Sequence, residues 1–354
     1  MKRLFGICVP WCICCFIAFG ISVAVFGRDS SVTTKAYETL SGWHEAEDYD
    51  AIYLESNSIA VSLTSDNIDD TEFRLESCCP YVHCEANISD GTYYINTWID
   101  TSHLFSYYMS VIVDGICSSV SDFPTSLLDS VFSSGGTGGA FDFSLGTLYI
   151  TVPDRIYESL DVYLGSGSVD ISSDISAERY VFDVGSGSLD YSGGGLGAEA
   201  MHVTLGSGRI SIDGIEPDYY NINIGSGSFE ISGLSQGEFD MGSGSGTLSF
   251  ASLGAENTID IGSGSLDIYL PSDASARIYT DIGSGNAAHI YGSSRVYLSD
   301  GGEYVLGGGD GSFIISMGSG SVNLWCDSFT STGNDLRTAV TTVTGSSAID
   351  NTNG

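Results

Sequence analysis

A motif that returns about every 20 residues constrains the fold of this chain more than any other feature. It consists of an apolar–x–apolar pair, the tetrapeptide Gly-Ser-Gly-Ser and a second apolar–x–apolar pair, as in VYLGSGSVDI (162–171). Other copies are FDVGSGSLDY (182–191), VTLGSGRISI (203–212), INIGSGSFEI (222–231), IDIGSGSLDI (259–268) and ISMGSGSVNL (315–324). A fixed period of this length is typical of repeat architectures, in which each unit buries its apolar face only against its neighbours. A flexible Gly/Ser linker would lack the paired apolar residues on both sides.

The spacing within the motif predicts two strands that meet at a corner. Val162 and Leu164 alternate with outward positions, and so do Val169 and Ile171, which is the period of a half-buried strand. Leu164 and Val169 are five residues apart, so one straight strand would send the two pairs to opposite faces. The tetrapeptide must therefore turn the chain, which glycine allows because it tolerates positive φ. The predicted corner residues are Gly165, Gly185, Gly206, Gly225, Gly244, Gly262, Gly283 and Gly318.

We therefore expect an all-β fold: a β-solenoid of about 20-residue repeats, similar to a single-stranded β-helix. A stacked β-sandwich is the alternative. The solenoid should span residues 45–326, with a degenerate N-terminal cap region at 45–140 and regular repeats at 141–326. Residues 29–44 are predicted to be a linker, and the Ser/Thr-rich tail at 327–354 to be disordered.

Residues 1–28 are predicted to be a transmembrane anchor or a signal segment. The run from Leu4 to Phe26 is uncharged, and a helix of that length rises about 34 Å, enough to cross a hydrocarbon core of about 30 Å. Lys2 and Arg3 should stay in the cytoplasm, which sends the remaining chain outside. We expect a single-pass membrane protein with an extracytoplasmic C-terminal domain, or a secreted protein if the segment is cleaved.

The charge of the chain argues against nucleic acid as a partner. Asp and Glu number 45 against 11 Lys and Arg, for a formal charge of −34 at pH 7. A phosphate backbone is bound by neutralising it with Lys and Arg, which are scarce here. Apolar residues make up 42% of the chain, enough to fill a core.

The positions between the paired apolar residues should point outwards and form two polar columns if the repeats stack about 4.8 Å apart. Before the corner they are Tyr163, Asp183, Thr204, Asn223, Asp240, Asp260 and Asp281, and after it Asp170, Asp190, Ser211, Glu230, Ser249, Asp267 and Asn323. Neighbouring carboxylates repel one another, and Ca²⁺ could relieve this repulsion through oxygen ligands. Asp240, Asp260 and Asp281 form the best run for a weak Ca²⁺-binding face. We favour the alternative, a solvated acidic face that discourages aggregation.

The cysteines outside the first apolar run are Cys78, Cys79, Cys84, Cys117 and Cys326. An oxidising exterior permits disulfides, and an odd count leaves at least one thiol unpaired or shared between chains. Cys78, Cys79, His83 and Cys84 could together offer three sulfurs and an imidazole to Zn²⁺, but the cluster lacks a CxxC pair. Disulfides and free buried thiols are the favoured alternatives.

We do not expect an enzyme, and we expect no cofactor beyond the weak Ca²⁺ face. Solenoids also host polysaccharide lyases, which need a positioned base and a positive group to hold a sugar acid. Between residues 160 and 326 the basic residues are only Arg179, Arg209, Arg277 and Arg295, with His202 and His289. We expect no nucleophile elbow, and the five histidines show no spacing typical of a triad.

Two segments carry a resemblance to a known family: IYLPSDASARIYTDIGSGN (268–286) and GGGDGSFIISMGSGSVNLW (307–325). They resemble the bacterial putative-adhesin domain family of unknown function, which has Gly-Ser-Gly β-strand repeats and is related to the toast-rack envelope domains. The resemblance covers roughly residues 45–326, although the cysteine-containing stretch at 73–140 departs from it. It implies a β-solenoid outside a bacterial membrane, usually tethered by one helix, and it implies no catalytic residues.

Two functions remain after this reading. The first is a non-enzymatic structural or adhesion-like module at the cell surface, displaying a rigid acidic solenoid to an envelope or surface protein. The second is an envelope-sensing or regulatory accessory protein that binds a membrane partner. The predicted cytoplasmic head, Met1-Lys2-Arg3, is too short for a signalling domain, which favours the first. Tyr163, Tyr219 and Tyr220 are candidate exposed contacts with a partner.

Overall fold

The computed structural model describes residues 38–45, 49–77, 81–102, 146–172, 174–291, 294–326 and 330–331. The predicted membrane or signal segment, most of the linker, and all of the predicted tail except 330–331 lie outside these residues. Every regular element in the described part is a β-strand. Within the same residues, no helix has the length and apolarity that crossing a bilayer requires.

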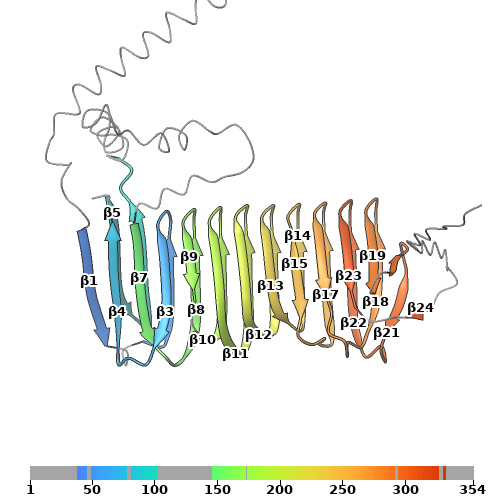
Figure 1. The fold of residues 1–354 in the computed structure, drawn as a ribbon, viewed down its shortest axis with the longest axis horizontal. Helices are drawn as coiled ribbons and strands as arrows, with labels where there is room; N and C mark the ends of the chain where they lie inside the picture. Colours follow the sequence, from blue (N-terminus) through green and yellow to red (C-terminus); the bar gives the residue numbers. More distant parts are fainter. Residues whose placement is uncertain are drawn as a thin grey trace, which may run out of the picture.

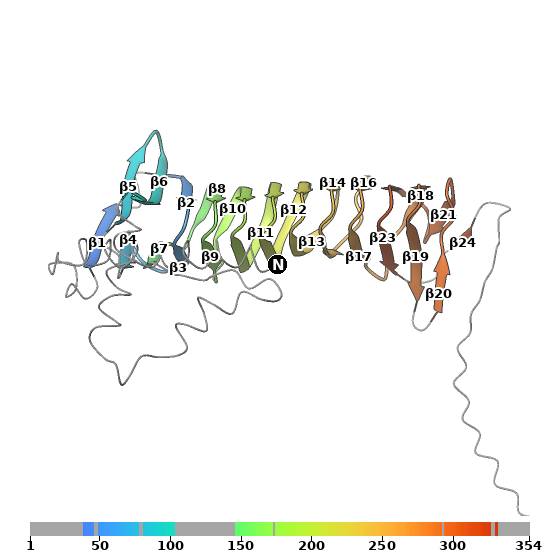
Figure 2. The same cartoon turned by 90° about the horizontal axis from the view of Figure 1, so that it is seen from above.

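Each coil of the solenoid consists of two strands that face each other across the core (Figure 2). We call the sheet formed by the strands that precede a Gly-Ser-Gly-Ser corner the leading layer, and the sheet formed by the strands that follow a corner the trailing layer. End strands are assigned to the layer with which they pair. In spatial order the leading layer contains β5 (Val82–Ser89), β6 (Thr92–Ile99), β2 (Ala51–Ser56), β8 (Ile156–Leu164), β10 (Ser176–Val184), the second halves of β11 (Ser188–Leu205) and β12 (Arg209–Ile224), β14 (Gly237–Met241), β16 (Glu256–Ile261), β22 (Gly311–Met317), β18 (Ala276–Ile282), β21 (Glu303–Leu306) and β24 (Thr330–Ser331).

The trailing layer runs alongside it in the same direction. Its spatial order is β1 (Glu38–Glu45), β4 (Asp70–Ser77), β7 (Gly146–Pro153), β3 (Ala60–Asp66), β9 (Ser168–Ile171), the first halves of β11 and β12, β13 (Ser228–Leu234), β15 (Ser245–Phe250), β17 (Ser265–Tyr269), β23 (Ser321–Trp325), β19 (Asn286–Tyr291) and β20 (Ser294–Tyr297). Figure 1 shows the coils side by side along the long axis of the molecule.

Neighbouring coils pair in parallel throughout the body of the rod, whereas antiparallel strands close its ends. Parallel pairs such as β14–β16 and β15–β17 keep equivalent repeat positions opposite each other. The antiparallel pairs are β1 with β4, β4 with β7, β5 with β6, β18 with β21, β21 with β24, and β19 with β20. The last described strands carry short or irregular pairing at the C-terminal end, which limits the edge available for uncontrolled strand addition.

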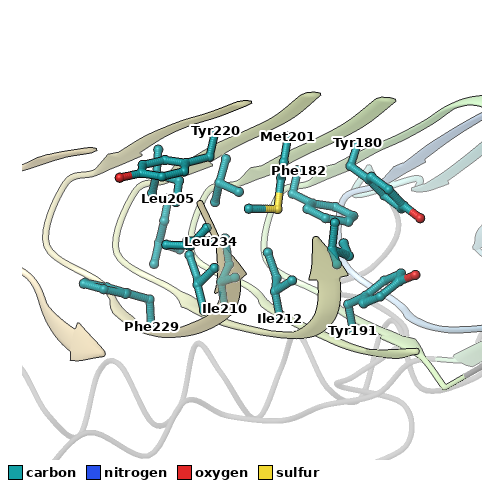
Figure 3. Close-up of a cluster of buried hydrophobic side chains, with 14 of the residues drawn as sticks. Tyr180, Phe182, Tyr191, Met201, Leu205, Ile210, Ile212, Tyr220, Phe229 and Leu234 are labelled. Atoms are coloured by element: carbon teal, nitrogen blue, oxygen red, sulfur yellow. The ribbon is translucent and has the colours of Figure 1, made fainter. Parts of the chain in front are cut away.

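The core lies between the two layers and runs continuously along the rod. Val162, Leu164, Val169 and Ile171 are all buried, so both apolar pairs of the motif point inwards as predicted. Figure 3 shows Phe182, Met201 and Tyr220 of the leading layer facing side chains such as Ile210 and Ile212 of the trailing layer. Burying one large apolar side chain contributes about 1.5–3 kcal/mol, and each coil buries several, but only when its neighbours cover them.

The spatial order of the coils departs from chain order at both ends. The coil of β22 and β23, the last in sequence, lies between β16–β17 and β18–β19. At the other end, the coil of β2 and β3 lies between β6–β7 and β8–β9. The coils of β2–β3 and β22–β23 are thus each covered by a coil from further inside the sequence, while the first and last described strands, β1 and β24, lie at the outer edges (Figure 1).

Candidate functional site

The corners stack into two columns of glycine that run along one edge of the rod. The first column is Gly165, Gly185, Gly206, Gly225, Gly242, Gly262, Gly318 and Gly283 in spatial order. A Cβ on any of them from Gly185 onwards would lie 2.6–2.9 Å from the carbonyl oxygen of the glycine on the preceding coil. The second column, two residues later in each coil, is tighter: a Cβ at Gly208 would lie 2.0 Å from Gly187 O.

Close approach, and not backbone conformation, makes glycine necessary at these corners. The described glycines with positive φ are all elsewhere, in turns and connectors such as Gly91 and Gly307. The corner amides instead bond from coil to coil, for example Ser186 N to Gly165 O at 2.7 Å and Ser207 N to Gly185 O at 2.8 Å. The reason predicted from the sequence is therefore corrected: these glycines supply space for a neighbouring carbonyl, not a left-handed turn.

Gly244 belongs to the second column, and Gly242 occupies the corner position predicted for it. Met241-Gly242-Ser243-Gly244-Ser245-Gly246 places glycine at three alternate positions, so the letters fit two alignments. The structure selects the alignment in which Met241 and Leu248 are buried. The same shift of two residues puts Thr247, not Ser249, in the outward column opposite Glu230 and Asp267.

The predicted run of three carboxylates is reduced to a pair. Asp240 and Asp260 are direct neighbours on β14 and β16. Ser316 of the inserted strand β22 lies between Asp260 and Asp281, because β22 pairs with β16 on one side and with β18 on the other. Asp281 is thus two strand spacings from Asp260, about 9.6 Å. Across the described residues, no group of three or more His, Cys, Asp or Glu side chains could hold a metal ion.

Strand alternation separates the candidate zinc ligands that the structure describes. The His83 ring stacks on Trp98 of β6, with centroids 5.4 Å apart, on the outer face of β5. Cys84, the next residue, points to the opposite face, where burial raises the pKa of its thiol to about 11. Adjacent residues of one strand cannot converge on one ion. Cys78, Cys79 and Cys117 lie outside the described residues, and Cys326 follows β23 at the far end of the rod.

The three predicted tyrosine contacts have different surroundings. Tyr220 is fully buried, and its hydroxyl donates to Asn257 Oδ1 at 2.9 Å, so its prediction as an exposed contact is wrong. Tyr163 and Tyr219 are half-buried. Tyr220 lies two residues before Ile222 and four before Ile224, which are both buried, so extending the alternation of the motif by one step places it inside.

Exposed large apolar side chains gather at the two ends of the rod. They are Tyr94, Trp98, Tyr149 and Ile156 towards the N-terminal end, and Tyr269, Tyr279, Tyr291, Val296 and Tyr297 towards the C-terminal end. Among the described side chains, none of this kind falls between residues 157 and 268. The middle of the rod therefore presents polar side chains, and apolar contact surface is restricted to its ends.

The N-terminal end carries a row of tyrosines on the leading layer. Tyr53 lies between Tyr94 and Tyr163, with ring centroids 5.3 Å and 5.0 Å away. Asp161 of β8 lies directly opposite Tyr53. Burial raises the pKa of the Asp161 carboxyl, although the guanidinium of Arg179 lies 3.5 Å away. These rings contact one another across the strands, so much of this row serves to join neighbouring coils.

The C-terminal end carries a denser group on the trailing layer, which we call the trailing-face patch: Asp267, Tyr269, Arg295, Tyr297, Asn323 and Trp325. The Tyr269 and Trp325 rings are nearly parallel, at 6°, with centroids 5.6 Å apart. Asp267 Oδ1 accepts from Asn323 Nδ2 at 2.8 Å and from Trp325 Nε1 at 3.2 Å. Arg295 Nη2 donates to Asn323 Oδ1 at 2.7 Å. The network fixes four polar or aromatic side chains beside an exposed ring.

The motif spacing did not predict this patch, although part of the signal is present in the sequence. Tyr269 and Trp325 each follow an inward apolar pair, so alternation predicts that both point outwards. Their contact depends on β23 pairing with β17, which brings together residues 56 positions apart in the chain. Only the inserted position of the last coil makes them neighbours.

A hollow of about 400 Å³ lies at the connectors on the other edge of the rod, lined by Ser252–Ala255, Asp273–Ser275, Asp310 and Gly311. The Ser275 hydroxyl donates to Asp310 Oδ2 and accepts from the amides of Gly308 and Asp310. These polar groups satisfy one another and hold the connector before β22 in place. We assign the hollow a structural role.

Comparison with known proteins agrees with this geometry. Residues 129–301 match the family model Toastrack DUF4097, so the resemblance to the toast-rack family drawn from the repeats is confirmed. No curated protein matches the chain.

Several solved bacterial proteins also match the chain, with TM-scores below 0.5. A putative lipid binding protein from Parabacteroides distasonis is 16% identical, with a TM-score of 0.45 over 81% of this chain and 96% of that one. A putative adhesin from Bacteroides fragilis is 10% identical, with a TM-score of 0.41 over 81% and 97%. A putative cell adhesion protein from Clostridium sporogenes is 10% identical, with a TM-score of 0.25 over 82% and 99%.

Proposed function

From the Toastrack DUF4097 domain that residues 129–301 carry, we propose that this protein is a non-enzymatic contact module. It displays a rigid, acidic β-solenoid outside a membrane and makes adhesion-like contact with an envelope or surface component. This proposal concerns a physical role, the holding of a contact surface at a distance, and requires no catalytic group.

The distribution of exposed apolar side chains carries the proposal. Large apolar side chains are exposed at both ends of the rod, and the described coils between them expose none. Exposed apolar groups are a general mark of interaction surfaces when they gather in one place. A rod that is polar along its length and apolar at its ends is suited to contact partners end-on while its sides stay soluble.

The regular pairing of the coils supports the rigidity that such a role needs. The positions that flank each corner are in register between neighbouring coils from β8 to β17, with shifts confined to the connecting stretches of β11–β12 and β13–β15. The corner amides add a further coil-to-coil ladder. In a stacked repeat of this kind, bending the rod would break several main-chain hydrogen bonds at once.

The predicted anchor gives the rod a direction. A membrane segment at Leu4–Phe26 would place the end that contains β1 near the bilayer and the end that contains β18 and β19 away from it. The formal charge of −34 would then repel the rod from anionic lipids and favour a projecting orientation.

Two measurements on cells that produce the full chain test this proposal. With a C-terminal epitope tag, a protease that cannot cross membranes should remove the tag from intact cells. The same cells should attach to a panel of bacterial and host cells more strongly than cells without the protein. Tyr297→Ala, at the exposed end, should reduce attachment, whereas Thr204→Ala, exposed on a central coil, should leave it unchanged. A protected tag, or attachment that is the same with and without the protein, would refute the proposed role.

A further inference from the structure

We infer that the trailing-face patch binds a neutral carbohydrate through stacking on Tyr269 and hydrogen bonds to Asp267. The inference rests on the proposed function, because it names the chemistry of the contact made at the C-terminal end. It is carried by one exposed ring, Tyr269, which stacks on the half-buried Trp325 beside a pre-formed polar network.

The aromatic pair supplies a stacking surface that is held in place. Tyr269 is 43% exposed although its ring stacks on Trp325 at 5.6 Å. On its other side, the residue opposite Tyr269 on β15 is Ser249, which is too small to cover the ring. The apolar C–H face of a pyranose can therefore lie against Tyr269, as apolar groups do on exposed aromatic rings.

The polar network offers hydroxyl-binding groups whose conformations are already restricted. Asp267 Oδ1 receives both Asn323 Nδ2 and Trp325 Nε1, which leaves Asp267 Oδ2 without a hydrogen bond to any described residue. Arg295 holds the Asn323 amide from the other side. A carboxylate oxygen beside an amide can pair with two neighbouring sugar hydroxyls. Because the side chains are already ordered, binding costs less conformational entropy.

The composition of the patch favours a sugar over a protein partner. Arg295 reaches across Ala288 and Ile290 of β19 to Asn323, and both apolar residues are buried although they belong to the outward positions of that strand. The polar network therefore divides the exposed rings, Tyr269 and Tyr297, into separate apolar areas. A protein–protein hot spot would need a larger continuous apolar centre.

The charge of the chain favours a neutral ligand. The formal charge is −34, and Asp267 lies in the patch itself. Arg295 donates Nη2 to Asn323, and the Asp267 carboxylate in the same patch opposes the binding of a phosphate or a uronate. Polyanionic glycans would meet repulsion from the whole rod.

The test uses the full chain in lipid nanodiscs and four immobilised polysaccharides: a glucan, a mannan, a galactan and, as the anionic comparison, polygalacturonate. We expect at least one neutral polymer to retain the protein and polygalacturonate to retain none. Tyr269→Ala should weaken retention about tenfold, which is the loss expected for one aromatic stacking contact. Tyr269→Phe, which keeps the ring, should bind like the unaltered chain.

The matched control is Tyr279→Ala, since Tyr279 is exposed to a similar extent, 38%, at the same end but on the leading layer. It should bind like the unaltered chain and should lose comparable stability. Retention of polygalacturonate alone, retention of no polymer, or equal loss in the two alanine variants would overturn the inference. If Tyr269→Ala and Tyr279→Ala have the same melting temperature, a loss of polysaccharide retention in Tyr269→Ala alone cannot be due to unfolding.

Cell attachment separates this inference from the proposed function. If the producing cells attach, and periodate oxidation of the target surface leaves attachment intact while protease treatment removes it, the partner is a protein and only the carbohydrate inference fails. If a neutral polysaccharide binds but no cell attachment depends on the chain, the inference stands and the proposed function fails.

Discussion

At the scale of single residues, the corner glycines show how stacking distance selects an amino acid. A Cβ at Gly208 would lie 2.0 Å from Gly187 O, a separation that real Cβ atoms do not reach, and the obstructing atom belongs to the backbone. Neither coil can shift without disturbing the ladder that joins Arg209 N to Gly187 O at 2.9 Å. The carbonyl group of the neighbouring coil therefore leaves no room at this position for any residue with a Cβ atom.

Gly208→Ala is expected to destabilise the protein by about 1–3 kcal/mol, the usual cost of forcing an extra methyl group into a packed site. The lowered midpoint should be measurable by thermal or urea unfolding followed by circular dichroism. Ser207→Ala, in the same corner, removes only an exposed hydroxyl and should stay within about 0.5 kcal/mol. Equal midpoints for the two variants would show that the coils have room for a side chain at the corner.

The buried tyrosines predict a loss of stability at alkaline pH. Burial raises the pKa of Tyr157, Tyr191 and Tyr220 well above the ordinary value of 10.0. The unfolded chain releases these protons near pH 10 while the folded chain keeps them, so stability is complete below about pH 10 and falls as the pH rises further. Melting temperatures from about pH 8 to 11, with tyrosinate absorbance, should show ionisation and unfolding together.

Tyr191→Phe provides the comparison for this pH effect. Tyr180 and Tyr191 both donate to Ile175 O at 2.9 Å, so the variant leaves that carbonyl bonded to Tyr180. It removes one group that titrates only on unfolding, and the fall of melting temperature with pH should become shallower. A melting temperature that does not change up to pH 11 would mean that these tyrosines are not withheld from solvent.

At the scale of strands and coils, the inserted coils at the two ends change the order in which parts of the rod are expected to open by local unfolding. In a solenoid wound strictly in chain order, the last coil in sequence has one neighbour and opens first. Here β22 pairs with both β16 and β18, and β23 pairs with both β17 and β19. The last coil in sequence therefore has the hydrogen-bonded surroundings of a central coil.

Hydrogen exchange should reflect this position. The amides of β22 and β23 are expected to exchange as slowly as those of β14 and β15, although they lie near the C-terminus of the chain. The amides of β20 and β21, which close the end, should exchange faster. Rapid exchange in β22 and β23 would indicate that the inserted coil opens independently of its neighbours.

At the scale of the whole molecule, electrostatic self-repulsion should dominate the response to ions. The formal charge is −34, while the described residues bring together no group of three or more potential metal ligands. Added salt screens repulsion between exposed carboxylates over about 10 Å at 0.1 M ionic strength, which favours the folded rod. The acidic columns are therefore expected to respond to ionic strength and valence, not to the identity of the cation.

Melting curves in NaCl, MgCl₂ and CaCl₂ test this expectation. The melting temperature should rise with salt, and Ca²⁺ and Mg²⁺ at equal concentration should act alike. A chelator should have no effect in NaCl alone. A rise produced by Ca²⁺ and not by Mg²⁺, and lost in Asp260→Asn, would instead establish a selective calcium site on β14 and β16.

Several residues were predictable because local chemistry decides their environment. The inward positions of Val162, Leu164, Val169 and Ile171 follow from strand alternation on either side of a corner. The two strands per coil and the all-β class follow from the same pattern. By contrast, Gly244 and Asp281 were misplaced because their positions depend on which strand lies alongside, and Tyr220 was misplaced although alternation from Ile222 places it inside.

The corner and the side of each strand that faces the core follow from residues a few positions apart, and the period follows from comparing one copy of the motif with the next. Tertiary structure alone decided the order of the coils at the ends, and with it the separation of Asp260 from Asp281 and the contact of Tyr269 with Trp325. The physical reason is that the coils are nearly equivalent: each presents the same backbone ladder and the same apolar pairs to a neighbour. Local pattern therefore cannot distinguish which coil stacks on which, and the choice falls to the connectors and closing strands that only the complete fold brings together.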